Sequence, residues 1–248
     1  MAKYRENLPM LRKDRIFLGE GGLMTEFLFG EETKDVQLPG GLFFHLIKDE
    51  KVMNWHDRFY RQFMDLCLRE NNGYGYIILA FFTYKARKED AETLLNIKEE
   101  EWIKMNKDYI QRFDDMRTEY EQSIPNCPPI LIQGLMCAKG DEGDAFLLNA
   151  KMTAEEAEEY HNDQIKMFAE NTKVDFVFVC LVAYSEEAIG ICNAAAKVNL
   201  PVVISFTTEM DGRLAGGESI KVWPEKIFIS CLISTTKKAE SNSCAPNF

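Results

Sequence analysis

The short run Gly19-Glu20-Gly21-Gly22 is the first place in the chain where residue types and spacing could do chemistry. It directly follows an apolar segment that we expect to be a strand. Glycines at the carboxyl end of a strand let a ligand approach the backbone amides, and Glu20 could accept a hydrogen bond from an ammonium group. A tight turn with a surface glutamate is the simpler interpretation, and spacing alone favours it.

A second polar run, Ser205–Leu214 (SFTTEMDGRL), overlaps the end of the apolar stretch Val202–Phe206. If parallel strands close into a barrel, Thr207, Glu209 and Asp211 lie on the rim where the loops after the strands gather. A simple polar turn accounts for the composition equally well.

The cysteines could in principle bind zinc, which needs three or four soft ligands at one point. The chain has seven cysteines and three histidines, without a Cys-x-x-Cys or Cys-Cys pair. His161 falls on the apolar side of an expected helix, so we interpret it as a packed, hydrogen-bonded residue. Cys180, Cys192 and Cys231 lie in apolar runs, which is typical of reduced, buried cysteines, and disulfides are not expected. Without a Gly-x-Ser-x-Gly elbow, acyl transfer has no support.

The elements that must position these residues are short apolar runs alternating with long amphipathic stretches. Because most runs are continuous rather than alternating, they predict parallel strands covered on both faces, and hence an α/β fold, either a closed barrel or an open doubly wound sheet. No Gly-x-Gly-x-x-Gly follows a strand, which makes a dinucleotide site a weak interpretation. The expected strands are Ile16–Leu18, Tyr76–Thr83, Ile130–Met136, Phe176–Ala183, Val202–Thr207 and, more weakly, Ile227–Ile233.

Several helix starts can be predicted from capping residues. Asn54 is the expected cap of a helix that ends near residue 71, and a second helix is expected over Glu99–Gln122. Thr153-Ala-Glu-Glu156 has the pattern of a capping box. Ser185 is the expected cap of a helix over Glu186–Val198.

Composition limits the class of protein. With 248 residues, 46% hydrophobic and 28% charged, the chain is long enough for one barrel-sized globular domain or two small ones. Its net charge of −11 argues against duplex nucleic acid or an anionic membrane as partner. The first 15 residues lack the apolar core of a signal peptide, and no apolar run approaches the roughly 20 residues of a membrane helix. We therefore expect a cytoplasmic protein that acts on a small molecule.

Six segments together resemble the homocysteine S-methyltransferase family, in chain order and with similar gaps. They are residues 15–29 (RIFLGEGGLMTEFLF), 41–50, 76–87, 151–165, 183–220 and 242–248, of which 183–220 (AYSEEAIGICNAAAKVNLPVVISFTTEMDGRLAGGESI) is the longest. The resemblance implies a (β/α)8 TIM barrel. It also implies transfer of a methyl group to the homocysteine thiol, giving methionine, from a sulfonium, betaine or methylfolate donor.

The resemblance also assigns a site. Glu20-Gly21-Gly22 stands where the family has its Asp-Gly-Gly substrate loop, and with Thr207 and Glu209 it is the expected binding site for homocysteine and the methyl donor. Zinc is implied too. Cys244, within a segment similar to the one around the family's first zinc cysteine, is the one ligand assigned, because the family's Cys-Cys pair is not found. No catalytic residue is assigned.

The expected organisation is an N-terminal extension (1–14), a homocysteine-binding barrel lacking its last two strand–helix units (15–233) and an irregular tail (234–248). The expected function is homocysteine S-methyltransferase. The alternative is a non-catalytic homologue that binds a small sulfur amino acid or a protein partner. Because uncovered strand edges favour association, a homo-oligomer is a further expectation.

Overall fold

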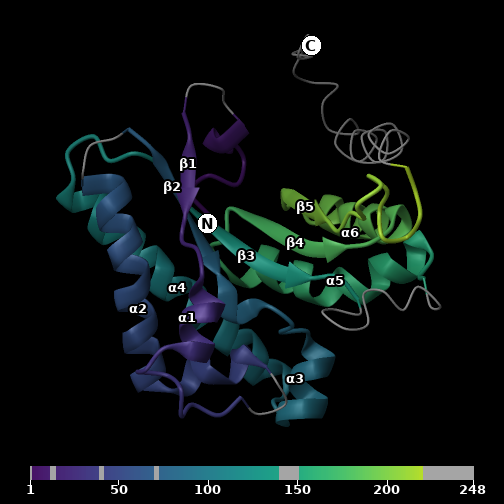
Figure 1. The fold of residues 1–248 in the computed structure, drawn as a ribbon, viewed down its shortest axis with the longest axis horizontal. Helices are drawn as coiled ribbons and strands as arrows, with labels where there is room; N and C mark the ends of the chain where they lie inside the picture. Colours follow the sequence, from purple (N-terminus) through teal and green to yellow (C-terminus); the bar gives the residue numbers. More distant parts are fainter. Residues whose placement is uncertain (1, 12–14, 39–41, 70–72, 140–150, 220–248) are drawn as a thin grey trace. The chain divides into compact units, whose positions relative to one another are not determined.

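The computed structural model describes residues 2–11, 15–38, 42–69, 73–139 and 151–219 (Figure 1). Within it, contacts define two compact units. Unit 1 comprises Met1–Met136 with Met167–Phe178, and unit 2 comprises Cys137–Lys166 with Val179–Phe248. The expected strand Ile227–Ile233, the expected tail and Cys244 lie outside the described residues. No helix in the described ranges is long and apolar enough to cross a membrane.

Five strands form one sheet in the order β1-β2-β3-β4-β5, which is also their order in the chain. They are β1 (Phe17–Gly19), β2 (Gly75–Ala80), β3 (Ile130–Cys137), β4 (Phe176–Val182) and β5 (Val202–Phe206). The pairs β1–β2 and β2–β3 are parallel, with Leu18 opposite Tyr76 and Tyr76 opposite Ile130. A doubly wound sheet would reverse its strand order part-way, and these five strands do not.

The first five predicted strands are confirmed, with small changes at their ends. The first begins one residue later than predicted, and the second ends at Ala80, where a 3-10 turn, η5 (Phe81–Thr83), replaces the expected extension. Thr83 explains this turn, because its hydroxyl lies within hydrogen-bond distance of the carbonyls of Ala80 (2.7 Å) and Leu135 (2.8 Å). The chain therefore leaves the strand after Ala80, although the apolar sequence continues to Phe82.

In the described ranges, six α-helices connect or flank the strands. They are α1 (Leu23–Phe29), α2 (Glu50–Met64), α3 (Lys88–Leu95), α4 (Glu99–Ser123), α5 (Ala154–Asn171) and α6 (Ser185–Lys197). Shorter turns are η1 (Pro9–Leu11), η3 (Phe43–Lys48) and the π-helical η4 (Asp65–Arg69). The helix predicted over Glu99–Gln122 is confirmed as α4.

Two of the three predicted caps are wrong. The cap of α2 is Asp49, whose carboxylate accepts the Lys51 and Val52 amides, so Asn54 lies inside the helix. The first turn of α2 is charged and resembles a loop in sequence, so the predicted start of the helix came too late. The Ser185 side chain makes no capping hydrogen bond to α6. The Ser185 amide donates to the Glu218 carboxylate (3.3 Å).

The third cap, a capping box, is confirmed. The Thr153 amide donates to the Glu156 carboxylate (2.8 Å), and the Glu156 amide donates to the Thr153 hydroxyl (3.2 Å). Reciprocal bonding of this kind satisfies two amides that a helix start would otherwise leave without partners.

The core of unit 1 is an aromatic cluster between α2, α4 and the turn after β2. Tyr60, Phe82, Tyr109 and Phe113 surround His56, with ring centroids 4.5–5.4 Å from the imidazole. All five side chains are buried. A polar imidazole in such surroundings is stable only when its nitrogens are hydrogen-bonded, and both are.

Candidate functional site

The carboxylate of Glu20 lies at the carboxyl end of β1 and is held by β2. Glu20 accepts a hydrogen bond from the Leu79 amide (2.8 Å) and another from the Tyr76 hydroxyl (3.0 Å). Leu18 is opposite Tyr76 in the register, so alternation along the strand places Glu20 on the same face as Tyr76. That face also receives Tyr60 from α2, whose hydroxyl donates to the Leu79 carbonyl.

Burial dominates the electrostatics of this carboxylate. It raises the pKa of Glu20 to about 7, while the hydrogen bonds from the Leu79 amide and the Tyr76 hydroxyl act in the opposite direction. Burial, together with the neighbouring Glu20 carboxylate, raises the pKa of Tyr76. Near neutral pH, Glu20 is therefore present in both its protonated and its ionised form, beside a tyrosine that stays neutral.

The backbone of Gly21 and Gly22 borders an open cavity of about 630 Å3 in unit 1. A side chain at either glycine would meet no atom within 4 Å, and Gly22 has the left-handed φ of 73° that glycine adopts most easily. Trp55 and Phe59 of α2 line the cavity, with their rings stacked 5.7 Å apart. Glu20 is not among the lining residues, so the loop turns its backbone to the cavity and its carboxylate to the strands.

Thr207 and Glu209 lie in unit 2, in a hairpin that follows β5. The Thr207 amide donates to the Val182 carbonyl (2.9 Å), which fixes the start of the hairpin to the end of β4. The Glu209 amide donates to the Arg213 carbonyl (2.7 Å), and Thr208 pairs with Leu214. Thr207 is half-buried, whereas Glu209 is exposed near the tip of the hairpin.

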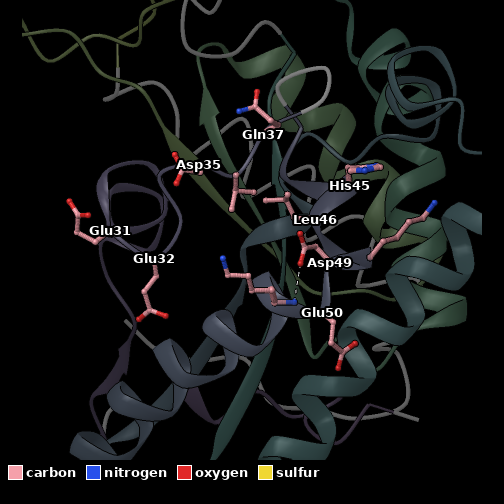
Figure 2. A pocket seen from close by; sticks show the side chains of 11 residues that line it. Glu31, Glu32, Asp35, Gln37, His45, Leu46, Asp49 and Glu50 are labelled. Atoms are coloured by element: carbon pink, nitrogen blue, oxygen red, sulfur yellow. Dashed lines mark hydrogen bonds between the residues drawn. The ribbon is translucent and has the colours of Figure 1, made fainter.

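A second cavity of unit 1, about 890 Å3, contains none of the predicted site residues (Figure 2). It lies between the segment after α1 and the start of α2, and its lining is largely acidic: Glu31, Glu32, Asp35, Asp49 and Glu50, with Lys48 and Lys51. Figure 2 shows Glu31, Glu32 and Asp35 on one side and His45 and Asp49 on the other. Asp49 is already engaged as the cap of α2.

Comparison with known proteins decides the family. The model of the family described as homocysteine S-methyltransferase matches residues 18–230, which contain β2 to β5 and all of β1 except Phe17. The chain belongs to the homocysteine S-methyltransferase family. No curated protein sequence matches it.

Solved structures show the same fold. The metallated form of the homocysteine methyltransferase MmuM from Escherichia coli is 13% identical, with a TM-score of 0.66, over 89% of this chain and 73% of that one. The oxidized form is 14% identical, with a TM-score of 0.67, over 88% of this chain and 70% of that one. At this identity, the likeness establishes the fold that the family members share.

The family's zinc does not fit the residues that the structure describes. Among them, no group of three or more His, Cys, Asp or Glu side chains could hold a metal ion. Their five cysteines, which are thiols rather than disulfides, are Cys67, Cys127, Cys137, Cys180 and Cys192. Cys244, the ligand assigned from the sequence, lies outside the described residues.

The structure thus groups the predicted site residues in two sets. Glu20, Gly21 and Gly22 form one loop in unit 1, and Thr207 and Glu209 form one hairpin in unit 2. Sequence reasoning missed Tyr76 and Tyr60, the tyrosines whose hydroxyls lie beside Glu20. One signal was available: Tyr76 carries the only side-chain polar group in the apolar run Tyr76–Phe82.

Proposed function

We propose that this protein is a methyltransferase of the homocysteine type, which transfers a methyl group from a positively charged donor to the homocysteine thiol and forms methionine. The observation that carries the proposal is the family match over residues 18–230. The five parallel strands in sequential order and the likeness to MmuM support a (β/α)8 barrel as the scaffold. The cytoplasm is the proposed compartment, since cysteines within apolar strands suit a reducing environment.

The chemistry requires a thiolate and a good leaving group. The thiolate, not the thiol, is the nucleophile, so the homocysteine sulfur must lose its proton before or during attack. A sulfonium donor then gives up its methyl group and leaves as a neutral sulfide. The balance is thiol plus sulfonium giving two thioethers and one proton, and the protein must dispose of that proton.

The proposed roles of the site residues follow from their chemistry. The amides of Gly21 and Gly22 bind the substrate carboxylate, because backbone amides beside open space are good anion donors. Glu20, whose carboxylate faces β2 rather than the cavity, positions this loop through its hydrogen bonds from Leu79 and Tyr76. Thr207 and Glu209, on the hairpin of unit 2, are proposed separately as polar residues that contact a substrate.

Thiol methylation by the full chain tests the proposal. Homocysteine is incubated with S-methylmethionine, S-adenosylmethionine or betaine, with and without added zinc, and methionine is quantified by mass spectrometry. Methionine above the protein-free blank with at least one donor is the expected result. Absence of methionine with every donor, from a chain that is folded by circular dichroism, would reject the proposed reaction.

A matched pair of variants tests the site. Gly21→Ala places a methyl group in the open space beside the loop, and we expect kcat/KM to fall at least tenfold without loss of stability. Met210→Ala, at a fully exposed position of the hairpin in unit 2, should leave kcat/KM unchanged. Equal kcat/KM values for the two variants would remove the Glu20-Gly21-Gly22 loop from the site.

A further inference from the structure

Two cysteines of unit 2 lie opposite each other where β3 and β4 end. The Ala138 amide donates to the Cys180 carbonyl (3.0 Å). Further back along the same two strands, the Asp175 amide donates to the Ile132 carbonyl (2.8 Å). Residue numbers rise together in these two bonds, so the strands are parallel. In a parallel pair, a residue whose carbonyl accepts the amide of residue 138 lies opposite residue 137, so Cys137 and Cys180 are neighbours across the sheet.

Both cysteine side chains are on the less covered face of the sheet. A Cβ at Gly134 would lie 3.1 Å from an aromatic ring of α5, so the face of β3 that carries Gly134 packs against this helix. Side chains alternate along a strand, which places the buried Met136 on that face and Cys137 on the other. Cys180 shares the face of Cys137 because the two are opposite in the register. Both cysteines are partly exposed.

The spacing of the two cysteines suits a covalent bond between their sulfurs. Neighbouring strands lie about 4.8 Å apart, which sets the separation of opposite Cα atoms. Cysteines joined by a disulfide have Cα atoms roughly 4.4 to 6.8 Å apart and Cβ atoms that point to the same side. Cys137 and Cys180 meet both requirements without movement of the backbone.

Backbone hydrogen bonds hold both cysteines in place. Beyond Cys137, the Lys139 amide donates to the buried carboxylate of Glu187 (2.7 Å). Beyond Cys180, the last carbonyl of β4 accepts the Thr207 amide (2.9 Å). Two thiols that are held side by side react with each other as if each were at high concentration around the other.

A strained residue follows Cys180. Leu181 has a φ of 64°, in the left-handed region that a bulky side chain rarely adopts. Backbone strain of this kind concentrates at sites that do more than pack. Leu181 places the strain one residue from Cys180, at the end of β4.

We propose that Cys137 and Cys180 form a thiol-modification site, at which a low-molecular-weight disulfide such as oxidised glutathione is exchanged for a disulfide within the chain. The site is independent of the proposed methyl transfer. Protein disulfides in reducing compartments are mostly transient or redox-sensing. The pair is therefore expected as two thiols until the pool of small disulfides becomes oxidised.

The exchange is balanced in atoms and electrons. The thiolate of one cysteine attacks the small disulfide, forms a mixed disulfide and releases one small thiol. The thiolate of the other cysteine attacks the protein sulfur of the mixed disulfide, and the second small thiol leaves. Two protein thiols and one small disulfide thus give one protein disulfide and two small thiols, which carry the two protons. The protein is oxidised by two electrons and the small disulfide is reduced by two.

Disulfide mapping on the full chain tests the proposal. The folded protein is incubated with oxidised glutathione, the remaining thiols are alkylated with N-ethylmaleimide in denaturant, and the peptides are identified by mass spectrometry. We expect a peptide pair joined through Cys137 and Cys180 in most molecules. Dithiothreitol should convert it back to two thiols.

Single variants separate the pair from two independently accessible thiols. Cys137→Ser and Cys180→Ser each leave one cysteine that forms the mixed disulfide but has no partner to resolve it. The glutathione-bound fraction of that cysteine should exceed its value in the unsubstituted protein by at least about tenfold. Cys127→Ser is the matched control, because Cys127 is also partly exposed but lies in unit 1. It should form the same disulfide as the unsubstituted protein.

Three outcomes would overturn the proposal. The first is glutathione on both Cys137 and Cys180 of the same molecule without a bond between them. The second is two cysteines that stay as unmodified as in the untreated protein. The third is a disulfide that joins either one to a different cysteine. Methionine formation is not part of the measurement, so failure of the proposed reaction would leave these outcomes unchanged.

Discussion

Glu20 is the residue at which two opposing effects can be weighed. Two hydrogen bonds, from the Leu79 amide and the Tyr76 hydroxyl, favour its ionised form, and burial favours the neutral form. The pKa of about 7 shows that burial is the larger effect. An aspartate, shorter by one methylene, would reach less far toward the two partners on β2.

The raised pKa predicts how the stability of the protein depends on pH. Its folded value is above the unfolded value of about 4.5, so the folded state binds more protons between these two values. The contribution of Glu20 to stability is therefore complete below about pH 4.5 and is lost as the pH rises through about 7. We expect Glu20→Gln, which stays neutral, to be more stable than the unsubstituted protein by about 2 kcal/mol at pH 8.5.

Urea unfolding at pH 4 and pH 8.5 checks this prediction. At pH 4, below the unfolded pKa of about 4.5, position 20 is mostly neutral in the folded and unfolded states of both proteins, and their free energies of unfolding should agree within about 0.5 kcal/mol. A difference of the same size at both pH values would show that the carboxyl is not titrating in this range. Comparing the two proteins at each pH cancels the opposite trend from Asp57, Asp65 and Asp114, whose pKa values are lowered.

At the scale of elements, α5 and α6 are in close contact at Gly190. A Cβ at this position would lie 2.5 Å from the Ala154 carbonyl oxygen and 2.6 Å from the Ala157 Cβ. Close by, the buried Glu187 of α6 accepts hydrogen bonds from His161 (3.0 Å) and from the Lys139 amide (2.7 Å). The interpretation of His161 as a packed, hydrogen-bonded residue is thus confirmed.

Gly190→Ala should therefore destabilise unit 2, although alanine is the better helix former by about 1 kcal/mol. The clash is with backbone as well as side-chain atoms, so the two helices must separate, at a net cost of about 2 kcal/mol. Urea unfolding measures the change. Gly21→Ala, where the new methyl group meets no atom within 4 Å, is the control and should change stability little. A stabilised Gly190→Ala would mean that the helices are not in close contact.

The N-terminal segment is tied to the end of α5 by Arg5. Its guanidinium donates to the carbonyls of Ala169 (2.8 Å) and Val174 (2.9 Å), and the neighbouring Tyr4 amide donates to Asp175 (2.8 Å). Carbonyls at a helix carboxyl terminus carry partial negative charge, which suits a cation. The sequence alone assigned residues 1–14 to an extension and did not anticipate these bonds.

We expect Arg5→Met to lower the free energy of unfolding by about 2 kcal/mol, because it leaves several partly buried carbonyls without a donor. Lys3→Met is the matched control. Lys3 forms a partly exposed ion pair with Glu121 (2.7 Å), worth less than about 1 kcal/mol, and its ammonium lies 5.3 Å from the centroid of the Tyr4 ring. Equal losses in the two variants would mean that the segment is held by charge in general rather than by Arg5. Chemical denaturation of both variants decides this.

What could be predicted from the sequence differs between elements and contacts. The strands were readable because a continuous apolar run such as Phe176–Val182 has few alternatives to a buried strand. The start of α2 could not be predicted, because Asp49 and Asn54 are equally good caps in sequence. Only the fold shows which amides need a partner. The partners of Glu20 lie 56 and 59 positions further along the chain, and no local pattern encodes such pairs.

At the scale of the whole molecule, the net charge of −11 opposes self-association, whereas exposed apolar side chains in unit 1 favour it. Ile16 and Phe29, which flank β1 and α1, are 61% and 79% exposed, and Leu18 and Leu28 are partly exposed as well. Among the described strands, β1 pairs with β2 alone, so its other edge carries backbone groups without strand partners. Exposed apolar residues next to such an edge favour association.

We therefore predict a homo-oligomer whose mass depends on concentration and salt. Added salt screens the repulsion between acidic copies, so sedimentation should show a larger associated fraction at about 0.5 M than at 0.05 M salt. Phe29→Lys should shift the protein toward monomer at any salt concentration. Met210→Lys, which introduces the same charge at a fully exposed methionine on the unit 2 hairpin, should not. If both lysine variants shift the equilibrium equally, overall charge and not the surface around β1 and α1 governs association. If the unsubstituted protein is monomeric at both salt concentrations up to about 100 µM, neither overall charge nor the surface around β1 and α1 governs association, and the predicted homo-oligomer is wrong.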